Sequence, residues 1–474
     1  MLKVDLIVKS EHFYTMEGDG TGYREKQAMI VKDGAIFSIE PYRGIENKYE
    51  AESVLDLKHH VVLPGFIDAH MHTGDCIFRG VAQDTNNWMM YGYGPFSNVL
   101  KKEAGEYGSR LAITEAIKSG TTTFGDFEKD MEFVCQFIYD IGVRGNIAST
   151  IREAKRKTYH PGELYEFDEK MGYESLQENL DLYNKWHNKG NGRIKILFGP
   201  QGADFVSKDM LMEIQRIAKE KNTKIHMHLQ QGDRETYQVE KRYGKRPISW
   251  LDGIGFLDDT LISVHLTDAT DEEARLVAEK GASMILCPGS IGIIDGIVPP
   301  SKAFQDAGGF VALGSDQAPG NNCHNIFNEM KLGALFNKIK YKNPEVMPAW
   351  KMLRMATIEG AKAIGLGNMI GSLEKGKRAD FIAVDLNQTT MQPVFTKPMR
   401  NMVPNLVYSA RGSEVSHVAV DGKLIYKEGT LLTINEKDLL PEIRKYADEI
   451  GELASEEFWK INGTNAQFMR ENKL

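Results

Sequence analysis

Between residues 61 and 314, short apolar segments alternate with longer segments of helical periodicity. This alternation is typical of βα units, in which helices connect parallel strands. Glycines stand just before several of the apolar segments, where helix C-caps and tight turns favour them. Eight such units over roughly 250–300 residues predict an α/β protein with a closed (β/α)8 TIM barrel. The expected strands are 61–69, 121–124, 144–149, 195–198, 224–228, 261–265, 283–287 and 311–314.

The residues on either side of this region follow another pattern. Short apolar runs with hairpin turn signals at Asp33-Gly34 and Asp421-Gly422 indicate β strands near both ends of the chain. A single helix is expected over residues 349–366. The last forty or so residues form a charged segment that is typical of a helix that is solvated or that contacts another subunit. The expected domains are a composite β-sandwich of 1–60 and 368–430, a barrel of 61–367 and a C-terminal helical tail of 431–474.

The composition of the chain argues against several classes of partner. With 58 Lys and Arg against 66 Asp and Glu, the formal net charge of −8 argues against a nucleic-acid-binding surface. No apolar run approaches membrane-spanning length, and the N-terminal residues do not resemble a secretory signal. Four widely spaced cysteines without a C-x-x-C motif are typical of free thiols in a reducing compartment. We expect a cytoplasmic homo-oligomer that binds a small molecule and neither nucleic acid nor membrane.

His70 and His72 lie at the end of the first expected strand, and three other strand ends carry His228, His265 and Asp316. Side chains two residues apart on a strand point the same way, so the first pair can close on one metal ion. Neutral imidazole is the commonest protein ligand for metals, and buried His and Asp are uncommon unless they are paired or metal-bound. Because the strands of such barrels end at the functional face, these residues together predict a metal site there.

Other residues near these strand ends have two interpretations each. His226 precedes His228 by two residues, so it is either a ligand in its place or a core residue one layer deeper. Trp88, in the long loop after the first strand, either walls an aromatic substrate or only packs over the barrel mouth. Asn322 and His324, shortly after the last strand, either hydrogen-bond substrate or only structure their loop.

Five motifs are spread along the chain: LPGFIDAHMH (63–72), SGTTT (119–123), LGSD (313–316), MATIEGA (355–361) and GSLEKGKRAD (371–380). With these motifs the chain resembles the amidohydrolase superfamily, most of all its branch of s-triazine hydrolases and guanine- or cytosine-type deaminases. The resemblance covers nearly the whole chain and implies a (β/α)8 barrel beside a β-sandwich of N- and C-terminal strands. It also implies one divalent metal ion, Zn2+ before Fe2+, because the segment 198–201 lacks the carbamylated lysine of binuclear relatives.

The resemblance also implies roles for the residues at the strand ends. In such enzymes the metal is held by the strand-1 His pair, the strand-5 His and the strand-8 Asp, which implies His70, His72, His228 and Asp316. The carboxylate of Asp316 would move a proton from the metal-activated water to the leaving group. His265 would orient that water or stabilise the developing oxyanion. His226 is then a core or supporting residue.

Two positions depart from the deaminase branch. That branch has a Glu three residues after the strand-5 His, which protonates a ring nitrogen, whereas this chain has Gln231. Gln201 stands where a substrate-binding His is common. A neutral amide cannot donate the general-acid proton. We expect both glutamines to contact substrate, and Asp233 or Glu235 either replaces the missing acid or is a solvated residue at the start of a helix.

The sequence therefore predicts a metal-dependent amidohydrolase that hydrolyses a carbon–nitrogen bond of a small nitrogenous heterocyclic or aromatic compound, in a deamination-type reaction. Alternatives within this class are cleavage of an arylurea, carbamate or amide bond and dechlorination of a triazine-like ring. A distant alternative is a non-catalytic assembly protein. Relatives of that kind lose metal ligands, whereas all five positions of the metal centre are filled here.

Overall fold

The computed structural model describes all residues of the chain from 1 to 474 except 158 and 161. Its central sheet is parallel, with the order β13-β12-β11-β10-β9-β8-β7-β6-β14. The strands alternate along the chain with helices, as the pattern of the sequence predicts. Their bounds are β6 (Phe66–His72), β7 (Thr121–Glu128), β8 (Arg144–Ile151), β9 (Ile194–Pro200), β10 (Ile225–Leu229), β11 (Leu261–His265), β12 (Ser283–Leu286), β13 (Val311–Leu313) and β14 (Asp316–Gln317).

The eighth strand position of the barrel is shared by β13 and β14. β13 pairs with β12, and β14 pairs with β6 after an interruption at Gly314 and Ser315. A Cβ at Gly314 would lie 3.0 Å from the backbone N and O of His70, so only glycine allows this close approach to β6. The ring of strands closes here, which confirms the predicted TIM-barrel fold class.

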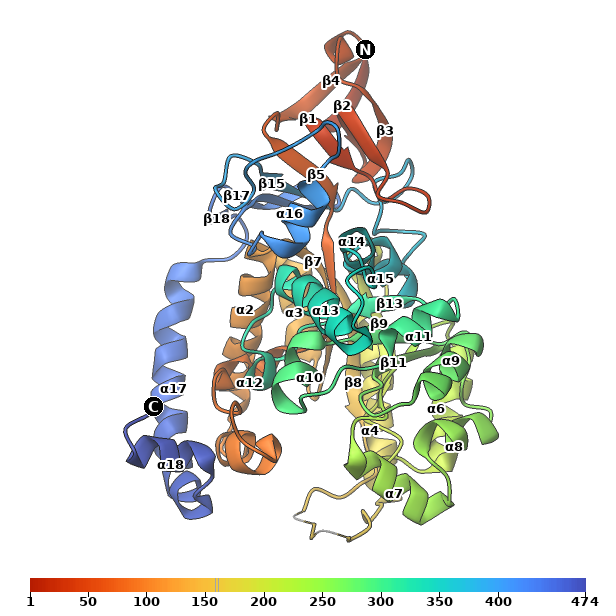
Figure 1. Cartoon of the computed structure of the whole chain (residues 1–474), viewed down its shortest axis with the longest axis vertical. Coiled ribbons are helices and arrows are strands. Elements are labelled where there is room, and N and C mark those ends of the chain that lie inside the picture. Colours follow the sequence, from red (N-terminus) through yellow and green to blue (C-terminus); the bar gives the residue numbers. More distant parts are fainter. Residues whose placement is uncertain (158, 161) are drawn as a thin grey trace.

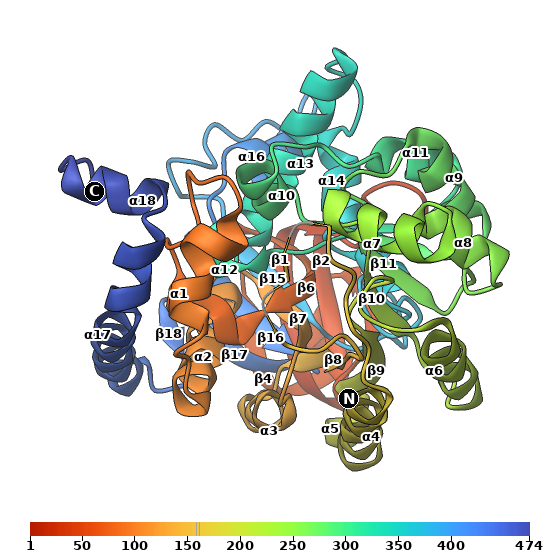
Figure 2. The ribbon, with the colours of Figure 1, turned by 90° about the horizontal axis from the view of Figure 1, so that it is seen from below.

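Helices surround the outside of this barrel, as Figure 2 shows in the view from below. α6 (Lys208–Glu220) is typical: Met210, Ile214 and Ile217 are buried at helical spacing, and Ser207 caps the first turn through the Met210 N–H. The other longer helices between barrel strands are α2 (Lys102–Lys118), α3 (Glu132–Ile141), α4 (Glu169–Trp186), α7 (Asp233–Tyr243), α8 (Pro247–Gly253), α9 (Asp271–Glu279), α10 (Pro288–Ile294) and α11 (Ser301–Asp306), followed by α13 (Ile326–Tyr341). α1 (Gly94–Ser97) and α5 (Lys189–Gly192) are shorter helices between strands.

Strands from both ends of the chain form a second, mixed sheet. It lies next to the N-terminal ends of the barrel strands and is at the top in Figure 1. β15 pairs antiparallel with β5, so the C-terminal strands extend the sheet that the N-terminal strands begin. The N-terminal members are β1 (Leu2–Tyr14), β2 (Tyr23–Lys32), β3 (Ala35–Pro41), β4 (Tyr49–Asp56) and β5 (His60–Pro64). The C-terminal members are β15 (Phe381–Asp385), β16 (Val415–Val420), β17 (Lys423–Lys427) and β18 (Thr430–Leu431).

Two expected elements are each divided in the structure. The expected strand 61–69 breaks at Gly65, so β5 belongs to the terminal sheet and β6 to the barrel. A Cβ at Gly65 would lie 2.3 Å from the Thr122 side chain, and the Gly65 N–H donates to Asp380 O, the last hydrogen bond on the β5 side before the chain enters the barrel. The expected helix 349–366 is α14 (Ala349–Met355) and α15 (Ile358–Ala363). Thr357 separates them with φ −131° and donates its hydroxyl to Leu353 O.

The C-terminal residues run back along the barrel to the rim that lies farthest from the terminal sheet (Figures 1 and 2). α17 (Glu436–Ile461) packs against α2 and also against α1 (Gly94–Ser97), where the Phe458 and Phe96 rings are 6.0 Å apart. Beyond it, in α18 (Thr464–Arg470), Asn465 Nδ2 donates to Val81 O at 3.2 Å. The expected tail is therefore helical and packed on the loop that follows the first barrel strand. None of the helices in the described part of the chain is both long and apolar enough to span a bilayer.

Candidate metal centre and active site

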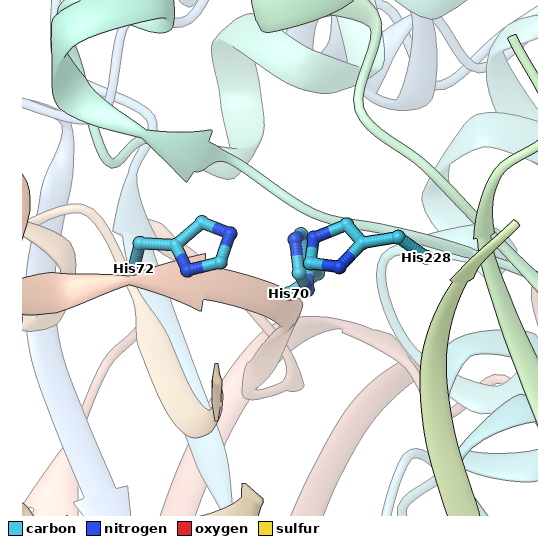
Figure 3. A group of neighbouring side chains, drawn as sticks. All are labelled: His70, His72 and His228. Carbon is cyan, nitrogen blue, oxygen red and sulfur yellow. The ribbon is translucent and has the colours of Figure 1, made fainter. Parts of the chain in front are cut away.

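Two barrel strands bring three imidazoles together at their C-terminal ends. His70 and His72 come from β6 and His228 from β10, and one nitrogen of each lies within 4.8 Å of the others. Figure 3 shows the three rings directed toward one another. A second set, His70 with His265 from β11 and Asp316 from β14, satisfies the same 4.8 Å limit. The five side chains predicted as the metal centre thus converge on one place.

Asp316 lies between the imidazoles. Its Oδ1 is 3.5 Å from His70 Nε2 and 3.5 Å from His72 Nε2, and its Oδ2 is 3.9 Å from His265 Nε2. These separations are longer than ordinary N–H···O hydrogen bonds, so the groups face a shared point and are not simply bonded to one another. Such spacing suits ligands of one ion.

Hydrogen bonds behind the centre orient two of the rings. His228 Nδ1 lies 2.9 Å from the carbonyl oxygen of Gln201, an acceptor only, so Nδ1 carries the proton and Nε2 offers its lone pair. His70 Nδ1 lies 2.9 Å from His226 Nε2, which leaves His70 Nε2 directed at the centre without a hydrogen-bond partner in the described residues. His226 therefore supports His70 from the core, the second of its two interpretations.

The charges at the centre suit a divalent metal. Burial lowers the pKa of His70 to about 3 and that of His265 to about 4, so both are neutral at neutral pH and able to bind a cation. Burial alone would raise the pKa of Asp316, but the neighbouring His265 and His70 hold it well below its ordinary value. Neutral imidazole nitrogens with one carboxylate form the donor set that Zn2+ and Fe2+ accept. The residues present therefore fit the predicted metal.

Two of these residues have a strained backbone. His265 has φ +76° and Asp316 has φ +60°, and both are buried. Left-handed conformations cost L-residues free energy and persist where the surrounding structure fixes them, which is common in active sites. At each position the turn of the chain carries the side chain away from the strand and into the centre.

A cavity of about 1000 Å³ opens from the metal centre. Its lining includes His72, His228 and Asp316 together with three residues predicted to contact substrate, which are Trp88, Gln201 and Gln231. Gln201 Oε1 accepts from Arg152 Nη1 at 3.0 Å, whereas the Gln231 amide makes no side-chain hydrogen bond within the described residues. The volume is sufficient for a small organic molecule.

The sequence did not predict several other residues that line the cavity. Asp75 follows β6, and its Oδ1 accepts from the Tyr93 hydroxyl at 2.9 Å. Glu128, at the end of β7, accepts the Gly74 N–H at 3.2 Å. Burial raises the pKa of Asp75 to about 6, and burial together with the nearby charge of Asp75 raises the pKa of Glu128 well above its ordinary value. Asp75 follows the His pair by only three residues, and this spacing was an available signal.

Asn322 and His324 lie outside the lining of the cavity. His324 is buried, with Nδ1 2.8 Å from Ser315 Oγ, and Asn322 ends the short helix α12 (Ala318–Asn321) in a left-handed conformation. Their contact with substrate stays a prediction, and the contacts they make in the structure belong to the loop after β14.

The two candidates for the missing acid also lie outside the cavity lining. Asp233 is exposed at the first position of α7. Glu235 is fully buried rather than solvated, and its Oε2 accepts the backbone N–H of Gln231 at 2.8 Å. Burial raises the pKa of Glu235 to about 8. The Glu235 carboxyl is therefore hydrogen-bonded to the backbone of Gln231, outside the cavity.

Comparisons with known proteins support this interpretation. The sequence profile of the amidohydrolase family matches residues 61–425. The 5'-deoxyadenosine deaminase of Methanosarcina mazei is 31% identical over 449 residues, which are 94% of this chain and 98% of that protein. The 5-methylthioadenosine/S-adenosylhomocysteine deaminase of Caldanaerobacter subterraneus is 33% identical over 404 residues, 85% of this chain and 89% of the relative.

Solved structures have the same fold. A zinc-bound adenosine deaminase from Xanthomonas campestris superposes with a TM-score of 0.86 at 25% identity, covering 95% of this chain and 99% of that one. A zinc-bound atrazine chlorohydrolase from Arthrobacter aurescens shares the fold at 17% identity, with a TM-score of 0.81 over 93% and 100% of the two chains. The family profile spans most of the sequence, and the relatives match over nearly their whole length. The chain therefore belongs to the amidohydrolase family and is a hydrolase of carbon–nitrogen bonds.

Proposed function

We propose that this protein hydrolytically removes an exocyclic amino group from an aminated heterocycle, and that a nucleoside of the 5'-deoxyadenosine type is the first substrate to test. The observation that carries the proposal is the convergence of three imidazoles and Asp316 at one end of the cavity. The curated relatives named as deaminases of 5'-deoxyadenosine and of 5-methylthioadenosine support this choice of substrate class.

His70, His72, His228 and Asp316 are the residues that would hold the metal. When bound, a divalent metal supplies activated water at neutral pH, because it lowers the pKa of water to about 7. The Asp316 carboxylate accepts one proton from the attacking water and returns it to the departing amine, while the second proton of that water passes to the neighbouring ring nitrogen, so that ammonia leaves and the ring carbon becomes a carbonyl. His265, neutral and fully buried, donates a hydrogen bond to the oxygen on which charge develops.

The test is ammonia release across a panel of aminated compounds: 5'-deoxyadenosine, 5'-methylthioadenosine, S-adenosylhomocysteine, adenosine, guanine, cytosine and melamine. We expect release from at least one adenosine-type compound and none from the His228→Ala variant. Absence of ammonia from the whole panel with zinc-loaded protein would contradict the proposal.

A second candidate function is hydrolysis of an arylurea, carbamate or amide. Gln231 favours it, because these bonds do not need an acid that protonates a ring nitrogen, and an amide at this place cannot be one. The same protein assayed with phenylurea and aryl carbamates distinguishes the two functions. Turnover of these compounds, together with no ammonia release from the panel of aminated compounds, would favour this second candidate function.

We also propose that the chain holds one metal ion, Zn2+ before Fe2+. The end of β9, the fourth strand of the barrel, reads Phe198-Gly199-Pro200-Gln201 and offers no lysine to bridge a pair of metal ions. Elemental analysis of purified protein is expected to give about one equivalent. A reproducible value near two would overturn the single-ion proposal, and the His70→Ala variant is the control that should lose the metal.

A further inference from the structure

The loop between β10 and α7 has an unusual backbone at both neighbours of Gln231. Gln230 has φ +55° and Gly232 has φ +91°. A Cβ at Gly232 would meet no atom within 4 Å, so its glycine is required by the backbone angle and not by lack of space. A three-residue loop with two left-handed residues does not keep one conformation without restraints.

One buried and two half-buried polar side chains, those of Glu235, Thr236 and Asp268, supply those restraints. Glu235 Oε2 accepts the Gln231 N–H at 2.8 Å, and Asp268 Oδ1 accepts the Gly232 N–H at 3.2 Å. The Thr236 hydroxyl accepts from Gln230 Nε2 at 2.7 Å and donates to Asp268 Oδ2 at 3.2 Å. All three residues of the loop are thus held from the side away from the cavity.

Gln231 is the one residue of this loop that lines the cavity, whose lining also includes His72, His228 and Asp316. It is half-buried, and its amide makes no hydrogen bond to the described residues. An unpartnered amide that faces a metal centre can donate to a ring nitrogen of substrate or accept from an amino group. Its direction is set by the backbone, which Glu235 holds.

Glu235 is at the third position of α7, where a glutamate commonly reaches back to cap the start of a helix. Capping alone would be a structural role. Here the N–H that it holds belongs to the residue that faces the metal centre, and its Oε1 is buried without a partner in the described residues.

We propose that Glu235 is a positioning residue for the substrate-binding amide of Gln231. In this chain a buried carboxyl group, that of Glu235, stands four residues after Gln231. This carboxyl accepts a hydrogen bond from the loop backbone, and it thereby fixes the position of an uncharged amide that contacts the substrate ring. The inference rests on the proposed function for its substrate, but its physical basis is the loop itself.

The test uses the zinc-loaded full chain with the substrate found by the panel. We expect Glu235→Ala to raise KM by about tenfold, because the hydrogen bond from the Gln231 N–H to the buried Glu235 carboxyl is lost and Gln231 is released. Glu235→Gln should restore most of the affinity, because its amide oxygen can accept the same N–H. Asp233→Ala, at the exposed start of the same helix, is the matched control and should leave KM unchanged.

A double-mutant cycle separates positioning from a general loss of structure. In the Gln231→Ala background, Glu235→Ala should change KM by less than about twofold, because the amide that it positions is already absent. If the increase in KM of the double variant equalled the product of the increases in the two single variants, the proposal would be overturned. So would a fall in kcat of about a hundredfold or more in Glu235→Gln, with loss of one limb of the pH profile, since that result assigns the acid to Glu235.

Hydrogen–deuterium exchange tests the same point without a substrate. We expect the peptide that covers residues 229–232 to exchange about ten times faster in Glu235→Ala than in wild type, and equally fast in Asp233→Ala and wild type. Unchanged exchange would overturn the positioning role even if the panel finds no substrate. An inactive wild type with the expected exchange would instead contradict only the proposed function.

Discussion

At the scale of single residues, Asp316 differs from the other side chains of the centre because it is the one carboxylate among the five. Asparagine keeps the size of the side chain but can neither hold a negative charge nor accept a proton. We expect Asp316→Asn to lower kcat about 100- to 10,000-fold, the range for loss of a general acid–base group. Steady-state assays on the substrate identified by the panel measure this change.

The matched control is Asp181→Asn, on the exposed face of α4. It removes one negative charge from the chain without touching the cavity, so it should keep wild-type turnover. If Asp316→Asn keeps more than about a tenth of wild-type turnover, the proton transfer assigned to Asp316 is wrong.

His187, far from the centre, makes stability depend on pH. Its Nδ1 accepts the Ile196 N–H at 3.1 Å and its ring stacks on Tyr183 at 4.2 Å. Burial, followed by the charge of Lys195, lowers its pKa to about 4, whereas the unfolded chain has the ordinary value of 6.5. Between these values the unfolded state binds the proton more readily, so the stability contributed by neutral His187 is present above pH 6.5 and is lost as the pH falls toward 4.

We therefore expect the thermal midpoint of wild type to fall more steeply between pH 7 and 5 than that of His187→Gln, whose side chain does not titrate. The difference between the two slopes is the measurement. Parallel slopes would contradict the depressed pKa. The side-chain resonances of His187, followed by NMR, should also keep their neutral positions through pH 6.

At the scale of elements, the barrel could be predicted because its strands are apolar runs of regular spacing. The points at which an expected element breaks in two could not be predicted, because they depend on contacts with residues far away in the sequence. The break at Gly65 follows from contact with Thr122 and Asp380, and neither neighbour is visible in the run 61–69. The ligand-type residues stand at strand ends and so could be placed in advance. Glu128 could not, because β7 continues four residues beyond the expected end of that strand at residue 124.

Gly65 gives a test at this scale. A Cβ there would lie 2.3 Å from the Thr122 Cγ2 and Oγ1 atoms, at the point where the chain passes from one sheet to the other. We expect Gly65→Ala to reduce the free energy of unfolding by about 1–3 kcal/mol, the usual cost of overpacking. Urea-induced unfolding, followed by tryptophan fluorescence, gives the value.

Thr122→Ala in the same chain removes the two nearest atoms that the new methyl group would meet, Cγ2 and Oγ1, and leaves only Cβ at 2.8 Å. The double variant should therefore lose less free energy of unfolding than the sum of the two single variants. A cost that adds fully across the two changes would show that the contact with Thr122 is not the cause.

At the scale of the whole molecule, one buried ion network connects the barrel to the terminal sheet. Arg144, at the start of β8, is fully buried and donates to both carboxylate oxygens of Asp380 at 2.8 and 2.9 Å. It also donates to Asp421 at 2.7 Å, and Arg378 donates to the same Asp421 oxygen. The network lies at the end of the barrel opposite the metal centre, where residues serve stability.

We expect Arg144→Met to reduce the free energy of unfolding by about 3–5 kcal/mol, because it leaves the buried carboxylate of Asp380 without its cation and removes one of the two arginines at Asp421. Urea-induced unfolding measures this loss. Lys170→Met is the control: its exposed pair with Glu174, 3.6 Å apart, should contribute less than about 1 kcal/mol. A loss in Arg144→Met as small as in this control would mean that the two parts of the molecule are held together without the network.

The pairing of β5 with β15 also has a consequence for biosynthesis. Strands β1 to β5 leave the ribosome first, but the neighbour that covers β5 is synthesised only after the whole barrel. Until then the nascent chain has an open β edge, the kind of surface that other chains join during aggregation. A ribosome that stalls within the barrel therefore releases a product whose first sheet cannot be completed, and such fragments should depend on chaperones far more than the finished protein does.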